Sequence, residues 1–257
     1  MRKPVPPLLF LLAYCTFMAF SADLTVQREV VGPLKNNCYL LFDEQSKEAA
    51  LVDVAGPVDS LLARIKKEGL RPKYVLITHA HADHTAGIPA IQQLFPAVQV
   101  CVSKEEVDDA PLYRDWRKQL DPKEVRKLES LPWAPTLMDF DFRAEVQPEV
   151  FVKGGDVILL GSDTVHAILS PGHSRGSICF TVDTMLFSGD VLFNGSVGRT
   201  DLPGGGGWDS LVVSVRRLYA SLPDESIVYP GHGPPTILGT EKRENPRISE
   251  HQAQRRK

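Results

Sequence analysis

The chain has 257 residues, of which 43% are hydrophobic and 24% are charged, and its formal net charge is -3. This length and composition are typical of one ordinary soluble domain that buries a sizeable core. The near-neutral charge disfavours nucleic acid or an acidic membrane surface as a partner.

Residues 1–22 differ in composition from the rest of the chain. A basic start leads into an apolar run at 8–20 and then into the small residues Ser21 and Ala22. This pattern predicts a signal peptide that is cleaved near Ala22, leaving a domain at 23–257 with no stable membrane insertion. We therefore expect a secreted or periplasmic protein. The alternatives are an uncleaved anchor, an organelle leader or a cytoplasmic protein.

The first half of the domain alternates predicted strands and helices. Apolar and β-branched runs indicate strands, a helical period followed by Gly69 indicates one helix, and a second helix begins near Thr85. The alternation implies a mixed sheet with helices packed outside it. The expected strands cover 24–31, 38–42, 49–54, 74–78 and 99–102, and the helices cover 57–68 and 85–95.

The strand at 74–78 runs into three histidines and an aspartate within six residues: His79, His81, Asp83 and His84. In extended backbone His79 and His81 project to the same side, and the following turn brings Asp83 and His84 toward a second point. Imidazole and carboxylate groups suit a borderline ion such as zinc. A polar loop after a core strand is the alternative, but this density of ligands favours a metal site for up to two ions.

Residues 103–151 are polar and punctuated by prolines, and 122–131 has the pattern of a charged helix. We expect an insertion over one face of the domain. Such a segment shapes a pocket or is a solvated excursion without a chemical role, and the sequence favours neither.

The second half again places ligands after strands. The expected strands cover 157–160, 164–169, 178–182, 185–187 and 227–229. Three of them run into His173, Asp190 and His232. Each of these is a weak signal alone, but four strand ends with His or Asp at one sheet edge predict a metal centre. The glycine run at 204–207 lacks the ending of a phosphate loop, so we expect a turn before a helix at 209–222.

Four motifs together resemble one family. They are the T-H-x-H-x-D-H at 78–84, P-G-H at 171–173, S-G-D at 188–190 and P-G-H-G-P at 230–234, with further pieces at 37–39 and 198–205. The set resembles the metallo-β-lactamase superfamily, and within it the short-form, glyoxalase II-like hydrolases. The resemblance implies an α/β (α+β) fold: an αββα sandwich of two mixed β-sheets with outer helices.

The resemblance also implies a two-metal site with two Zn2+ ions per chain, iron being possible. One ion would take His79, His81 and His173, the other Asp83, His84 and His232, and Asp190 would bridge them. A bridging hydroxide would attack a carbonyl, and Asp83 is the candidate catalytic residue because it is placed to orient that nucleophile.

The implied substrate is a small thioester of the acyl-glutathione type, or an ester. Only residues 233–257 follow His232, so we expect no counterpart of the C-terminal helical domain of full-length glyoxalase II enzymes, and another thioester or ester competes with glutathione. Arg199 and Asp201 either touch substrate or form a salt-linked loop, and the loop is favoured.

Several alternatives within and outside the fold stay open. They are a mononuclear iron persulfide (sulfur) dioxygenase, whose relatives share the G-R-T-D element at 198–201, a β-lactamase or lactonase, and a non-catalytic binding module. The charge speaks against RNA-processing members. The sequence leaves the oligomeric state open.

Overall fold

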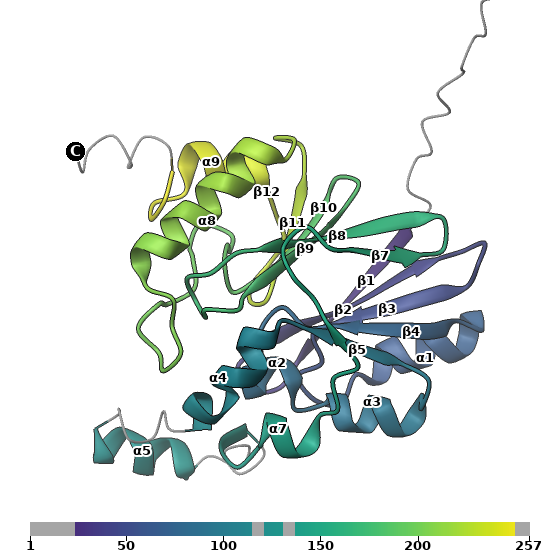
Figure 1. Cartoon of the computed structure of the whole chain (residues 1–257), viewed down its shortest axis with the longest axis horizontal. Helices are drawn as coiled ribbons and strands as arrows, with labels where there is room; N and C mark the ends of the chain where they lie inside the picture. Colours follow the sequence, from purple (N-terminus) through teal and green to yellow (C-terminus); the bar gives the residue numbers. More distant parts are fainter. Residues whose placement is uncertain (1–23, 115–120, 131–136, 250–257) are drawn as a thin grey trace, which may run out of the picture.

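The computed structural model describes residues 24–114, 121–130 and 137–249 (Figure 1). The predicted leader at 1–22 lies outside the described residues and stays a prediction. No helix within the described ranges is long and apolar enough to cross a membrane.

The first sheet has six strands in chain order within the described residues. The first three form an antiparallel meander, and the next three join as parallel strands, so the sheet is mixed as predicted. The strands are β1 (Leu24–Val31), β2 (Asn36–Asp43), β3 (Glu48–Val52), β4 (Arg71–Leu76), β5 (Gln99–Val102) and β6 (Val150–Phe151).

The second sheet also has six described strands, in the order β12-β11-β10-β9-β8-β7. Its neighbours are antiparallel except β10 and β11, which run parallel. The strands are β7 (Val157–Leu160), β8 (Asp163–Leu169), β9 (Ile178–Val182), β10 (Met185–Gly189), β11 (Ile227–Pro230) and β12 (Thr236–Ile237).

The helices cover the outer faces of the two sheets. Helices α1 and α3 pack on the first sheet and α8 and α9 on the second, while α4, α5 and α7 gather at the end of the first layer where α2 lies (Figure 1). The helices are α1 (Asp59–Glu68), α2 (Ala82–Thr85), α3 (Ile88–Leu94), α4 (Lys104–Arg114), α5 (Pro122–Glu129), α7 (Phe142–Glu145), α8 (Trp208–Ser221) and α9 (Leu238–Glu244).

Three hydrophobic cores separate the four layers. Leu61 and Ile91 belong to the core between the helices and the first sheet, Leu41 and Phe180 to the core between the sheets, and Val215 to the core under α8. This arrangement confirms the αββα sandwich.

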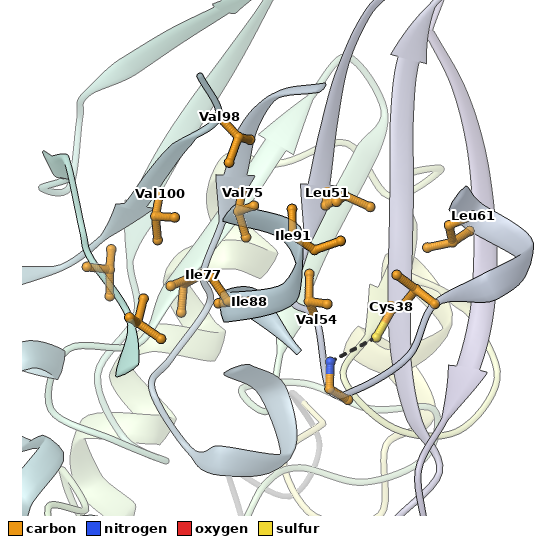
Figure 2. Close-up of a cluster of buried hydrophobic side chains, with 14 of the residues drawn as sticks. Cys38, Leu51, Val54, Leu61, Val75, Ile77, Ile88, Ile91, Val98 and Val100 are labelled. Carbon is orange, nitrogen blue, oxygen red and sulfur yellow. Dashed lines mark hydrogen bonds between the residues drawn. The ribbon is translucent and has the colours of Figure 1, made fainter. Parts of the chain in front are cut away.

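Strand β2 shows how the sequence builds two of these cores. Cys38 and Leu40 face the outer core, whereas Tyr39 and Leu41 face the second sheet. A strand that is buried on both faces is apolar at successive positions, as here. Figure 2 shows the outer core, where the Cys38 thiol also accepts the Ala55 N–H at 3.2 Å.

The prediction of one helix over 85–95 is wrong at its start. Helix α2 already contains Asp83 and His84, and a break at Gly87 separates it from α3. The break arises because the Gly87 N–H donates to the Val54 carbonyl at 2.8 Å instead of continuing the helix. Asp83 and His84 therefore stand on a short helical turn with fixed directions.

The strand expected at 49–54 ends two residues early. Strand β3 stops at Val52, and Asp53 takes a φ of 52°, in the left-handed region that an L residue seldom adopts. The Asp53 side chain consequently points toward the edge at which the predicted ligands gather.

Segment 103–151 was expected to be an insertion over one face of the domain. Its described parts instead contribute a strand and buried side chains to the first layer. Strand β6 extends the first sheet beside β5, and Phe140 and Phe142 are buried in its outer core. Glu106 on α4 is fully buried.

Candidate metal centre

The seven predicted ligands meet at one edge of the sandwich, although they come from both sheets. His79 and His81 follow β4, and Asp83 and His84 lie on α2. The other three follow the ends of β8, β10 and β11. Their side chains form three ligand groups in which the candidate ligand atoms lie within 4.8 Å of one another: His79, His81 and His173; His79, His84 and Asp190; Asp83, His84 and His232.

The first group consists of three imidazoles. His173 Nε2 lies 3.2 Å from His79 Nε2 and 3.0 Å from His81 Nδ1. A tetrahedral zinc ion with Zn–N bonds of about 2.0–2.1 Å holds its ligand nitrogens roughly 3.3 Å apart. The three nitrogens thus already have the spacing that one divalent ion needs.

The group of Asp83, His84 and His232, called the second group from here on, combines a carboxylate with two imidazoles. Asp83 Oδ2 lies 3.8 Å from His84 Nε2 and 3.5 Å from His232 Nε2. The His232 and Asp83 side chains are 26% and 19% exposed, so this group is partly open to solvent.

Asp190 lies between the two groups. Its Oδ1 is 3.4 Å from His84 Nε2, and its Oδ2 is 3.6 Å from both His173 Nε2 and His232 Nε2. One carboxylate therefore faces both groups, as the bridging position requires.

Two buried atoms at the centre lack a hydrogen-bond partner anywhere in the described chain. They are His84 Nε2 and Asp190 Oδ1, which face each other. Leaving such an atom unpaired costs about 1–3 kcal/mol. A cation bound between them would satisfy both, so the residues present fit a metal centre.

Burial sets the protonation of the first group. Burial, followed by the neighbouring imidazoles, lowers the pKa of His79 well below its usual value and the pKa of His81 to about 3. Both rings are therefore neutral near pH 7, and the neutral ring is the form that binds metal.

For Asp190 and His84, neighbouring opposite charges outweigh the effect of burial on the pKa. Burial alone would raise the pKa of Asp190, but the adjacent His84 and His173 lower it to about 2. The pKa of His84 is raised well above its usual value, because Asp190, Asp83 and Asp53 together outweigh its burial. Both shifts have the same cause, the attraction between the His84 ring and the carboxylates around it.

Asp53 is a site residue that the sequence analysis missed. Its Oδ2 accepts the His84 Nδ1–H at 2.8 Å and the Thr78 hydroxyl at 2.7 Å, and its Oδ1 accepts the Thr78 N–H at 2.9 Å. The bond to Nδ1 turns His84 so that Nε2 faces the centre. The sequence analysis placed Asp53 inside the strand expected at 49–54, and only the end of β3 at Val52 turns its side chain toward the centre.

Backbone carbonyl groups orient two further histidines. His173 Nδ1 donates to the Arg199 carbonyl at 2.8 Å, and His232 Nδ1 donates to the Leu34 carbonyl at 3.1 Å. Both rings therefore present Nε2 to the centre.

The loop that carries His232 is held by β2. Asn37 Nδ2 donates to the carbonyls of Pro230 and Gly233 at 2.7 and 2.8 Å, and the Tyr39 hydroxyl donates to Pro230 at 2.6 Å. These bonds give a physical role to the 37–39 motif.

Gly231 lets the loop approach the centre. A Cβ at this position would lie 2.3 Å from Asp190 Oδ1 and 2.7 Å from His84 Cε1. Only glycine fits there without displacing a ligand.

The structure also tests the predictions for the Arg199–Asp201 loop and for the glycine run at 204–207. Arg199 donates from Nε and Nη2 to both Asp201 oxygens at 2.8 and 3.0 Å, which confirms the salt-linked loop. The glycine run 204–207 precedes α8, as expected of a turn.

Residues 31–232 match the model of the metallo-beta-lactamase superfamily. The chain belongs to this superfamily. It is 32% identical to the hydroxyacylglutathione hydrolase GloC of Haemophilus influenzae over 84% of this chain and 94% of that protein.

Solved structures with the same fold include two that are at least 30% identical to this chain. The B3 metallo-beta-lactamase BLEG-1 is 30% identical, with a TM-score of 0.68 over 86% of this chain and 98% of the other. The di-iron-bound form of TTHA1623 is 32% identical, with a TM-score of 0.65 over the same shares. Relatives of this chain thus include a protein named as a hydrolase and one that holds two irons.

Proposed function

We propose that the chain is a metal-dependent hydrolase that cleaves a small thioester of the acyl-glutathione type, or an ester. The observation that carries the proposal is the convergence of two ligand groups on the shared carboxylate of Asp190. The relationship to GloC supports a thioester as the substrate class.

In this proposal the first group would hold one divalent ion, the second group would hold another, and Asp190 would offer its carboxylate to both. Nitrogen and oxygen ligands without thiolate favour zinc, and the di-iron form of TTHA1623 supports iron as the alternative. When bound, the ions would supply activated water near neutral pH and polarise the carbonyl of the substrate.

The chain's own residues position these ligands and the water. Asp53 and the carbonyl groups behind His173 and His232 fix the imidazoles. Asn36 Nδ2 donates to Asp83 Oδ2 at 3.0 Å and holds that carboxylate beside His232. The pKa of Asp83 is lowered because His84 and His232 outweigh its burial, so the ionised carboxylate can accept a hydrogen bond from the attacking water.

The cysteines of the described chain are poor candidates for a nucleophile. Cys38, Cys101 and Cys179 are buried free thiols, and burial raises the pKa of each to about 12. Because the thiolate is the reactive form, these thiols are inert near pH 7. This supports attack by water rather than by one of these cysteines.

The proposal is tested by elemental analysis of the purified protein together with hydrolysis of S-lactoylglutathione before and after chelation. We expect about two zinc or iron ions per chain and a hydrolysis rate that chelation removes and added metal restores. Metal-free protein that cannot be loaded would overturn the proposal. One iron with persulfide-dependent oxygen uptake would assign the chain to the dioxygenases, and hydrolysis of a β-lactam alone would assign it to the β-lactamases.

A further inference from the structure

Helix α4 places a buried carboxylate beneath the first ligand group. Glu106 is fully buried, and its Oε2 accepts the Ala80 N–H at 2.7 Å and the Tyr113 hydroxyl at 2.9 Å. Its Oε1 accepts the Gly176 N–H at 3.0 Å. Both oxygens of this carboxylate therefore have partners.

The two backbone groups that bind Glu106 come from different ligand segments. Ala80 stands between His79 and His81, after a strand of the first sheet. Gly176 follows His173 by three residues, after a strand of the second sheet. A single carboxylate consequently joins the segments that supply all three imidazoles.

The packing around Gly176 shows that this junction is closely fitted. Ser103 Oγ donates to the Gly176 carbonyl at 2.8 Å, so both backbone groups of Gly176 bind the start of α4. A Cβ on Gly176 would lie 2.4 Å from Ser103 Oγ and 2.8 Å from Glu106 Oε1.

Tyr113 extends the junction to a ligand ring. Its ring packs edge to face on the His81 ring, with 4.5 Å between centroids and 76° between planes. Its hydroxyl is the third donor to Glu106. The position of the His81 ring is thereby coupled to the same carboxylate.

We propose that Glu106 is a positioning residue for the metal site formed by His79, His81 and His173. It holds the two ligand segments at the separation at which their three nitrogens share one ion, without contacting that ion itself. The inference rests on the proposed metal-dependent function and adds to it a role for segment 103–151.

The test compares Glu106→Gln with Asp109→Asn on the same helix. Glutamine keeps the volume of Glu106 but turns an NH2 group toward one of its N–H donors. Asp109 binds Arg175, whose side chain is 55% exposed, and this pair also joins α4 to the His173 loop. Asp109→Asn therefore loosens the helix but leaves the Glu106 junction intact.

Metal-free wild-type and variant proteins are titrated with Zn2+ against a chromophoric chelator. We expect Glu106→Gln to weaken one of two binding steps by about 10–100-fold, the usual effect of losing an outer-shell partner. We expect Asp109→Asn to leave both steps unchanged. In a His81→Ala background, Glu106→Gln should have no further effect on zinc affinity, because the site it positions is already lost.

The outcomes separate the two proposals. If the wild type binds two ions and Glu106→Gln binds them with unchanged affinity, the positioning role is overturned and the hydrolase stands. An equal loss in Asp109→Asn also overturns it, because the loss would then follow from detaching α4. A wild type that binds no metal overturns both proposals.

A second variant guards against misfolding of Glu106→Gln, which circular dichroism of the metal-free protein would reveal. Tyr113→Phe removes one donor to Glu106 and keeps the ring against His81. We expect a smaller weakening of the same binding step. Unchanged affinity in Tyr113→Phe, with Glu106→Gln unfolded, would overturn the proposal.

Discussion

The two ends of the sandwich both use buried carboxylates to join the sheets, but the oxygens of Asp43 and Asp190 differ in their hydrogen bonds. At the end away from the ligands, Asp43 Oδ1 accepts the N–H groups of Gln45 and Ser46 at 2.7 Å, and its Oδ2 accepts the Ser162 N–H at 3.3 Å. At the ligand end, Asp190 Oδ1 has no hydrogen-bond partner within the described residues.

This difference separates a structural carboxylate from a functional one. Both oxygens of Asp43 accept hydrogen bonds from the protein itself, so Asp43 stabilises the fold without a bound ion. Asp190 is complemented by His84 Nε2, which is equally unpaired, and the pair fits a cation that the chain does not supply. The two carboxylates should respond to substitution in opposite ways.

The largest effect is expected from Asp190→Ala. The variant loses the carboxylate that faces both ligand groups, so thioester hydrolysis should fall to the rate of the buffer and zinc content should drop. Steady-state kinetics and elemental analysis measure both quantities. Asp43→Asn is the matched control, and near-wild-type turnover by Asp190→Ala would show that the site assignment is wrong.

The next effect is expected from Gly231→Ala, which keeps every ligand. The added Cβ would meet Asp190 Oδ1 and must push the carboxylate aside. Displacing a reacting group by about 1 Å costs roughly 100-fold in rate, so kcat/KM should fall by this order. Gly56→Ala is a control, since its φ is not positive and a Cβ there meets only Val31 Cγ1 at 3.4 Å, an ordinary contact. Equal activity of Gly231→Ala and wild type would contradict the close approach.

Asp43→Asn should reduce stability and spare activity. Loss of a fully bonded buried carboxylate should lower the free energy of unfolding by about 1–3 kcal/mol, measured by urea unfolding of metal-free protein. Unchanged stability, or a large loss of kcat, would contradict the assignment of Asp43 as a structural carboxylate.

The contribution of Asp43 to stability should depend on pH. Burial alone would raise the pKa of Asp43, but the N–H groups of Ser46, Ser162 and Gln45 lower it below its usual value. The stabilisation is therefore present above the unfolded pKa of about 3.9 and is lost as the pH falls through the lower folded pKa. The difference between wild type and Asp43→Asn should be largest near pH 7 and shrink below about pH 4.

The smallest effect is expected from Arg199→Ala at the rim of the metal centre. The guanidinium pairs with Asp201 in an exposed ion pair, and such pairs contribute about 0–1 kcal/mol. The Arg199 carbonyl that orients His173 remains. We expect kcat/KM to change by less than about fivefold. A hundredfold loss would instead place the guanidinium on the substrate.

The sequence predicted the ligands more completely than the residues that hold them. His79, His81, Asp83 and His84 form a dense local pattern, and the strands are visible as apolar runs. Asp53 was missed because its side chain acts through a left-handed backbone turn that no periodicity reports. The start of the helix at 85–95 was misplaced because a hydrogen bond to Val54, distant in sequence, breaks it at Gly87.

The sequence by itself determined the kinds of ligand, their places after strands and the alternation of layers, because these depend on local spacing and on which faces are apolar. Only the tertiary structure decided that His173 lies 3.2 Å from His79, 94 residues away, and that Glu106 binds both of their segments. Those contacts arise when two sheets close on one core, and such closure is a property of the packed whole.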